Sequence, residues 1–230
     1  MRHGRKEMTT PLERNSCLTK DFIEIAKTWN SEIEKVIFRS VWGGFDKLQA
    51  EDFRISREDE YIEVSISQAA IYRIEDYIFE KNPRSRLRLH PEPIEVGKTK
   101  RRGQPPRSDI GFRLIAGGFC SHLTLEAKII DPDSAVSKYV TEITDNFLTG
   151  RYSKYSSIGG MLGYLMSGDV ENAFSAISKS LSNSLSPHPD FLERNHKVSK
   201  HTRNLASGIG GDFTCHHLII KFCYTDEETP

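Results

Sequence analysis

The feature that most constrains the fold is a short run in which apolar and polar residues alternate. Within Leu123–Ile130, apolar side chains occupy every second position from Leu123 to Ile129, and Thr124, Glu126 and Lys128 stand between them. A period of two is typical of a β-strand, whose side chains point alternately to opposite faces. The run therefore predicts a strand with one apolar face. A carboxylate and an ammonium group project side by side from the other face.

A second strand is predicted immediately upstream. Ile110–Leu114 is rich in apolar residues, and Gly117-Gly118 lies between the two predicted strands. A glycine pair at such a place is typical of a tight hairpin turn. Asp109 stands at the mouth of the first strand, so antiparallel pairing is expected to bring it to the level of Glu126.

Helical periodicity surrounds this hairpin. Apolar residues recur at helical spacing between residues 22 and 41, and Gly43-Gly44 is expected to end that helix. Tyr61–Phe79 begins with strand-like alternation but continues at helical spacing, so we expect one helix there. Asp131–Ser134 is expected to form a turn and to provide the N-cap of a further helix, which continues to Phe147.

The C-terminal third is less uniform. Ile158–Met166 is compatible with a buried strand or with a tightly packed helix, and Ser167–Asp169 is expected to open a helix. Residues 190–212 are polar, basic and Gly-rich and read as irregular, whereas Phe213–Tyr224 reads as a final strand. This order of elements predicts an α/β fold, with α+β as the alternative, in which helices flank a mixed sheet.

Length and composition predict one domain. The 230 residues suit a single core, which we expect over residues 18–225. Within it, residues 18–56 are expected to be a helical appendage and residues 57–225 the core. Residues 1–17 are expected to be flexible, and residues 226–230 to be an acidic tail.

Charge and cysteine content exclude several classes of protein. Lys plus Arg and Asp plus Glu both total 32, so no overall field favours an acidic or a basic partner. Tyr155–Gly168, the longest stretch without a charged side chain, is shorter than the ~20 apolar residues that cross a membrane. Four cysteines without a CxxC pair are typical of a reducing interior, so we expect a cytoplasmic protein.

The residues at the predicted hairpin have the chemistry of a magnesium site. Asp109 and Glu126 supply carboxylates, and the backbone carbonyl of Ala127 lies between Glu126 and Lys128. These are hard oxygen ligands suited to Mg²⁺ or Mn²⁺. Lys128 is expected to hold or polarise an attacking water. Both Glu126 and Lys128 are expected to face a cleft rather than the core.

The combination of an Asp at a strand start with Glu-x-Lys on the next strand resembles the PD-(D/E)xK nuclease superfamily, which has the restriction-endonuclease-like fold. The resemblance spans about residues 60–165. It implies catalytic roles for Asp109, Glu126 and Lys128. It also implies a further acid on the preceding helix, for which Glu63 is the match and Glu60 the next candidate. The sequence departs from the family pattern in that no proline directly precedes Asp109.

The resemblance implies metal-dependent hydrolysis of phosphodiesters in nucleic acid, with DNA and endonuclease cleavage expected. A bacterial defence, antiviral or restriction-like role is expected on the same ground. No ATPase or sequence-reading domain is recognisable, so a second subunit or a homo-oligomer is expected to supply specificity. The candidate phosphate contacts are Lys98, Lys100, Arg101, Arg102, Arg107 and Arg151. A solvated loop is the alternative for the basic stretch, and a helix-end arginine is the alternative for Arg151.

Two further alternatives remain open. Cys120 and His122, together with Cys215 and His217, form a formal zinc set, although zinc ligands are normally tight pairs in loops. His216 or His217 is alternatively a core histidine, or reaches the nuclease site from the last strand. The rival function is a non-catalytic subunit that keeps the nuclease fold and binds nucleic acid or protein.

Overall fold

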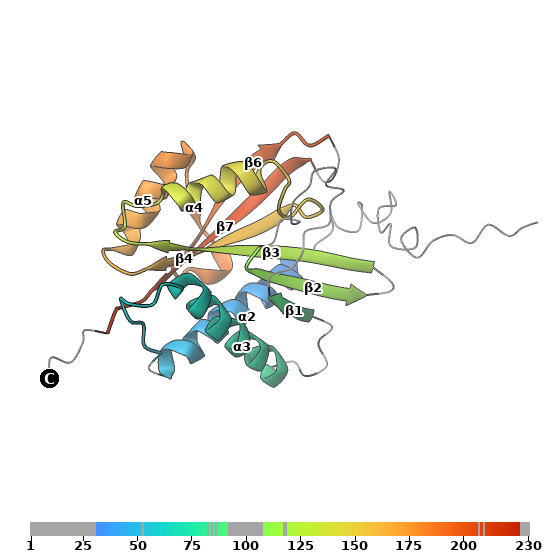
Figure 1. The fold of residues 1–230 in the computed structure, drawn as a ribbon. Coiled ribbons are helices and arrows are strands. Elements are labelled where there is room, and N and C mark those ends of the chain that lie inside the picture. The colour runs from blue at the N-terminus through green and yellow to red at the C-terminus, as the bar shows by residue number, and fades with distance from the viewer. Residues whose placement is uncertain are drawn as a thin grey trace, which may run out of the picture.

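The protein forms a seven-stranded sheet with helices on both faces (Figure 1). The structure, a computed structural model, describes residues 31–51, 53–81, 83, 85, 87–91, 108–116, 119–206, 208 and 210–225. This arrangement confirms the predicted α/β class. None of the helices in these ranges combines the length and apolar character that a membrane crossing requires.

The elements follow one another in a mixed order. The helices are α2 (Ser31–Ala50), α3 (Ile62–Lys81), α4 (Ser137–Thr141) with the π-helical segment η1 (Glu142–Phe147), α5 (Val170–Leu181) and the 3-10 turn η2 (Pro189–Phe191). The strands are β1 (Leu87–Pro91), β2 (Ile110–Ala116), β3 (Phe119–Ile130), β4 (Ile158–Leu165), β5 (Ser186–Pro187), β6 (His196–Arg203) and β7 (Gly211–Lys221).

The sheet has a parallel centre and antiparallel edges. Its strand order is β1-β2-β3-β4-β7-β6-β5, in which β4 pairs in parallel with both β3 and β7. The other neighbours are antiparallel. Strand β4 is buried along its whole length, as expected for a central strand covered on both faces. The structure thereby decides between the two alternatives for residues 158–166 in favour of a strand.

Two hydrophobic cores lie on opposite faces of the sheet. Helices α2 and α3 cover one face, and α4, η1 and α5 cover the other (Figure 1). The side chains of β4 point alternately to the two faces and so contribute to both cores. Leu162 and Tyr164 pack toward α2 and α3, whereas Met161 and Leu165 pack toward α4 and α5. Helix α2 therefore shares a core with the sheet.

The prediction that Gly43-Gly44 ends the first helix is wrong, because α2 continues to Ala50. The glycines serve close packing between α2 and α3. A Cβ on Gly43 would lie 2.2 Å from the Tyr77 ring, and a Cβ on Gly44 would lie 2.3 Å from Ile74 Cγ1. Such distances are far below van der Waals contact, so only glycine permits this approach. Residues 22–30 of the predicted helix lie outside the described residues.

Of the remaining secondary-structure predictions, the structure confirms some and contradicts others. The helix at 61–79, the antiparallel hairpin and the helix opened by Asp169 are confirmed as α3, β2–β3 and α5. Ser134 does not cap α4, whose N-cap is Val136 without a side-chain hydrogen bond. The irregular reading of residues 190–212 is wrong, because β6 lies within it. Its sequence, HKVSKHTR, lacks apolar alternation, and its buried Ser199 is instead hydrogen-bonded to His217 at 2.8 Å.

Candidate functional site

The predicted site forms where β3 extends beyond its partner β2. Strand β2 begins opposite Leu125, so the last residues of β3 have no strand along that edge. Backbone N–H groups on such an edge need other acceptors. The Ala127 N–H donates to Asp109 Oδ2 at 2.7 Å, and the Ile129 N–H donates to Glu63 Oε2 at 3.1 Å. The backbone of β3 thus fixes both carboxylates in place.

Lys128 joins these groups to one another. Its ammonium donates to the carbonyl of Ala127 at 2.7 Å, to Glu126 Oε1 at 2.9 Å and to Glu63 Oε1 at 3.1 Å. These three bonds use all three of its protons. Glu142 Oε1 lies 3.9 Å from the same nitrogen. The structure therefore brings together every predicted member of the catalytic and metal-ligand sets.

Glu126 is the most deeply buried carboxyl group of this cluster, with a residue exposure of 6 %. Burial, reinforced by the charge of Asp109, raises its pKa to about 8, although Lys128 opposes the shift. Burial also raises the pKa of Asp109, against the hydrogen bond from Ala127. Burial alone would lower the pKa of Lys128, but the surrounding carboxylates, led by Glu126, raise it overall.

The expectation that Glu126 and Lys128 face an open cleft is wrong. The Glu126 side chain is 7 % exposed and that of Lys128 is 14 % exposed. Pairing explains how two charged side chains become so enclosed, since a buried charge is tolerated when it is hydrogen-bonded to an opposite one.

An unpartnered oxygen of Glu126 bears on whether these residues fit a metal ion. Glu126 Oε2 is buried and has no hydrogen-bond partner among the described residues. A buried carboxyl oxygen without a partner is costly unless a proton or a cation lies against it, and the raised pKa of Glu126 reflects this cost. The donor set of carboxylates and one backbone carbonyl consists of hard oxygens, which suit Mg²⁺ or Mn²⁺. Lys128 already donates to Glu126 Oε1 and to the Ala127 carbonyl, so two of the three predicted ligand groups are also hydrogen-bonded to it.

Sequence reasoning missed Glu142, which comes from the π-helical segment η1. Its Oε2 accepts a hydrogen bond from Asn146 Nδ2, and its other oxygen faces Lys128. Single π-helical turns recur at functional sites. A signal was present in the sequence, because Glu142 lies three residues after the core residue Tyr139 and therefore on the apolar side of the predicted helix.

The loop after η1 lies next to this cluster. Burial raises the pKa of Tyr152, and the charge of Glu126 adds to the effect whereas Arg151 opposes it. Arg151 is exposed. The buried guanidinium of Arg203 donates to the carbonyls of Ser153, at 3.1 Å, and Ser156, and thereby fixes the loop to β6. The predicted phosphate contacts Lys98, Lys100, Arg101, Arg102 and Arg107 lie outside the described residues.

The histidines of β7 point to opposite faces of the sheet. His217 is a buried core histidine with hydrogen bonds to Tyr139 at 3.1 Å and Ser199 at 2.8 Å. Cys215 is buried as well. The side chains of Cys120 and His122 lie outside the described residues. His216, one position along, faces α2, where it stacks on Phe38 with ring centroids 4.1 Å apart.

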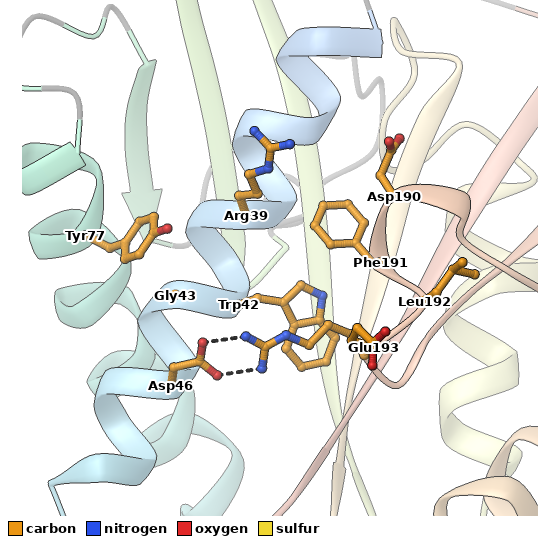
Figure 2. A pocket seen from close by; sticks show the side chains of 10 residues that line it. Arg39, Trp42, Gly43, Asp46, Tyr77, Asp190, Phe191, Leu192 and Glu193 are labelled. Atoms are coloured by element: carbon orange, nitrogen blue, oxygen red, sulfur yellow. Dashed lines mark hydrogen bonds and ion pairs between the residues drawn. The ribbon is translucent and has the colours of Figure 1, made fainter.

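A hollow of about 260 Å³ lies between α2 and the segment around η2 (Figure 2). Trp42 and Phe191 provide its aromatic wall, and Asp46 holds Arg194 through two hydrogen bonds of 2.7 and 2.6 Å. Arg194 lies over the Trp42 ring, 5.4 Å from its centroid. None of the residues that line this hollow belongs to the carboxylate cluster, so the two features are separate.

The chain has no match among protein-family models, curated proteins or solved structures in the comparisons made. Its function is therefore argued from the chemistry of the carboxylate cluster.

Proposed function

We propose that the protein is a metal-dependent hydrolase of phosphodiester bonds, with the carboxylate cluster as its active site. The observation that carries the proposal is the convergence of three carboxyl groups, those of Asp109, Glu126 and Glu63, on Lys128 and the β3 backbone. Glu126 Oε2 is buried there and has no hydrogen-bond donor among the described residues. Four carboxyl groups, Glu142 included, lie near one ammonium group. A purely structural ion pair needs no such excess of acid.

Asp109, Glu126 and the Ala127 carbonyl are the groups that would hold the ion. A bound Mg²⁺ or Mn²⁺ supplies positive charge at the phosphate and lowers the pKa of a coordinated water. The protein residues contribute position: the β3 backbone fixes Asp109 and Glu63, and Lys128 fixes Glu126. Lys128 also supplies a positive charge beside the developing negative charge of the reaction.

The particular activity that we propose is that of a nuclease, with DNA as substrate and internal cleavage. The resemblance to PD-(D/E)xK nucleases supports this choice, and so does the exposed Arg151 on the loop next to the cluster. A second subunit or a further copy of the chain is proposed to supply target selection. Cytoplasmic location and a role in bacterial defence remain predictions from the sequence.

The test is a cleavage assay on plasmid, single-stranded DNA and RNA with Mg²⁺, Mn²⁺ or Ca²⁺. Asp109→Asn keeps the acceptor for the Ala127 N–H but removes a charge, so we expect cleavage to fall at least about 100-fold. The matched control is Asp212→Asn, an exposed residue near the start of β7, which should cleave like the wild type. Mn²⁺ titration calorimetry on Glu126→Gln measures ion binding independently of turnover.

Two results would contradict the proposal. One is cleavage that persists in chelator, and the other is equal cleavage by Asp109→Asn and the wild type. Nucleic-acid binding without cleavage under every condition would instead favour the non-catalytic subunit.

A further inference from the structure

A second group of metal-type ligands lies on the opposite face of the sheet from Glu126 and Lys128. Leu125 of β3, Gly160 of β4 and His216 of β7 are in register across the sheet and therefore share a face. That face is covered by α2, whereas Glu126, one position along β3, points to the other face. Any site at His216 is thus separated from the proposed active site by the sheet.

The second group consists of Glu34, His188 and His216, which come from three distant parts of the chain. Glu34 is in the first turn of α2, His188 directly precedes η2, and His216 lies in β7. One ligand atom from each residue lies within 4.8 Å of the other two. Both histidines are buried, and the Glu34 side chain is 21 % exposed.

The two distances from the histidines to Glu34 suit ligands around a shared ion. His188 Nε2 and His216 Nε2 each lie 3.3 Å from Glu34 Oε1. A hydrogen bond from nitrogen to a carboxylate is usually about 2.7–2.9 Å long. Ligands at the corners of a tetrahedron with metal–ligand bonds of about 2.0–2.1 Å are about 3.3–3.4 Å apart. His188 makes a long hydrogen bond to Glu34 at this distance, and both separations also equal the spacing of tetrahedral ligands.

An unpartnered atom provides an independent indication. His216 Nε2 is buried and has no hydrogen-bond partner among the described residues, although Glu34 Oε1 is close. The nitrogen therefore does not point at the oxygen in the manner of a donor. A ligand of an ion points at the ion and not at the neighbouring ligand. Leaving this nitrogen unpaired is unfavourable, because a buried polar atom has lost its hydrogen bonds to water.

The hydrogen bonds of the histidines show which contacts would change if an ion bound to them. His216 Nδ1 lies 3.0 Å from His196 Nε2, which can accept its proton as a supporting residue does in metal sites. Coordination through Nε2 places the ring proton on Nδ1. Metal coordination would therefore break two long hydrogen bonds, because the accepting Nδ1 atoms of His188 and His196 would then carry protons. These bonds run from the Asp190 N–H to His188 at 3.2 Å and from Trp42 Nε1 to His196 at 3.4 Å.

We propose that Glu34, His188 and His216 bind one divalent transition-metal ion of the zinc class. Two imidazoles and one carboxylate are a ligand set that Zn²⁺ accepts, and three protein ligands leave one position for water. The ion ties the start of α2 to β7 and to the turn before β6. The partly exposed Glu34 gives it a path from solvent. This proposal is independent of the proposed nuclease activity.

The site also has a built-in reporter. Trp42 and Asp190, whose bonds to the histidines must change, both line the hollow beside α2 (Figure 2). The sequence contains two tryptophans, so Trp29→Phe leaves Trp42 as the single indole. Zinc binding is expected to change the fluorescence of Trp42.

The experiment titrates the chelator-treated full chain with Zn²⁺ in competition with a chromophoric chelator. Asp109→Asn and Glu126→Gln are included in the background so that the carboxylate cluster does not bind the ion. We expect one zinc per chain and a change in Trp42 fluorescence. Glu34→Gln and His188→Gln are each expected to weaken binding at least 100-fold. The matched control is Glu32→Gln in the same helical turn, which should bind like the background protein.

The outcomes separate the alternatives. Equal zinc affinity in Glu34→Gln and Glu32→Gln would overturn the proposal. Absence of stoichiometric zinc would also overturn it, and would identify the cluster as a hydrogen-bonded core. Because Glu34 is partly exposed and glutamine has the same shape, circular dichroism should show a native fold for that variant. A separate Glu34→Gln protein with the native Asp109 and Glu126 keeps the two proposals distinguishable, since it should lose zinc and still cleave DNA.

Discussion

Replacing Lys128 by Met in the metal-free protein removes the positive charge that joins the carboxylate cluster. The ammonium makes hydrogen bonds of 2.7, 2.9 and 3.1 Å, two of them to carboxylates. Removing one partner from a buried ion pair typically costs 3–5 kcal/mol. The Lys128 side chain is 14 % exposed and Glu63 is 31 % exposed, so water screens part of the interaction. We therefore expect the free energy of unfolding to fall by about 2–4 kcal/mol.

The assay is equilibrium unfolding in urea with a chelator present. At a slope of about 2 kcal/mol per molar urea, this loss moves the midpoint down by roughly 1–2 M. Lys138→Met, which removes an exposed lysine from α4, is the matched control and should change the midpoint little. Adding Mg²⁺ should recover part of the deficit, because a bound cation replaces the lost charge.

Combining Lys128→Met with Glu126→Gln measures the coupling between the two groups. The double variant is expected to be more stable than the sum of the single losses indicates, since Gln no longer needs a cation. A Lys128→Met protein within about 0.5 kcal/mol of the wild type would refute the reasoning, because that is the range of ordinary surface substitutions.

Three other substitutions test the fold around the site. Gly44→Ala places a methyl group against Ile74 and should lower the unfolding free energy by about 1–3 kcal/mol in urea. Arg203→Lys loses the planar fork that bonds the loop carbonyls, so both the thermal midpoint and DNA cleavage should fall, and an unchanged midpoint would contradict this role. Burial lowers the pKa of His201, so its contribution to stability is complete above about pH 6.5 and is lost as the pH falls below it. Between pH 6.5 and 5, the free energy of unfolding of His201→Gln should therefore fall less steeply with decreasing pH than that of the wild type. The two slopes should differ by up to about 1.4 kcal/mol per pH unit, as measured by urea titrations at each pH.

The hairpin and the long helices were predictable because local patterns determine them. The alternation along Leu123–Ile130 and the glycine turn specify β2 and β3, and the register then places Asp109 beside Glu126. The upstream acid Glu63 was matched through the resemblance to the nuclease family, which implies an acid on the helix before the first strand. The site is thus encoded largely by strand period and by sequence spacing.

Other features depend on contacts that sequence periodicity does not contain. Gly43 and Gly44 look like helix breakers until α3 is packed against them. Strand β6 was missed because its buried positions are polar and bond to β7. Glu142 was passed over because an acid on an apolar helical face has no local explanation, and only the fold brings it to Lys128. The pairing of Glu34 with His216 likewise joins residues from distant elements.

Because β3 extends beyond β2, the geometry of the site depends on the register in which the two strands pair. Side chains alternate between faces, so a slip of one residue would exchange the positions of Glu126 and Ala127. The N–H groups that fix Asp109 and Glu63 would move to the wrong level at the same time. A misregistered chain would hence lose the whole constellation rather than one member. The specific nuclease activity of a preparation would then be proportional to the fraction of molecules whose hairpin has the native register.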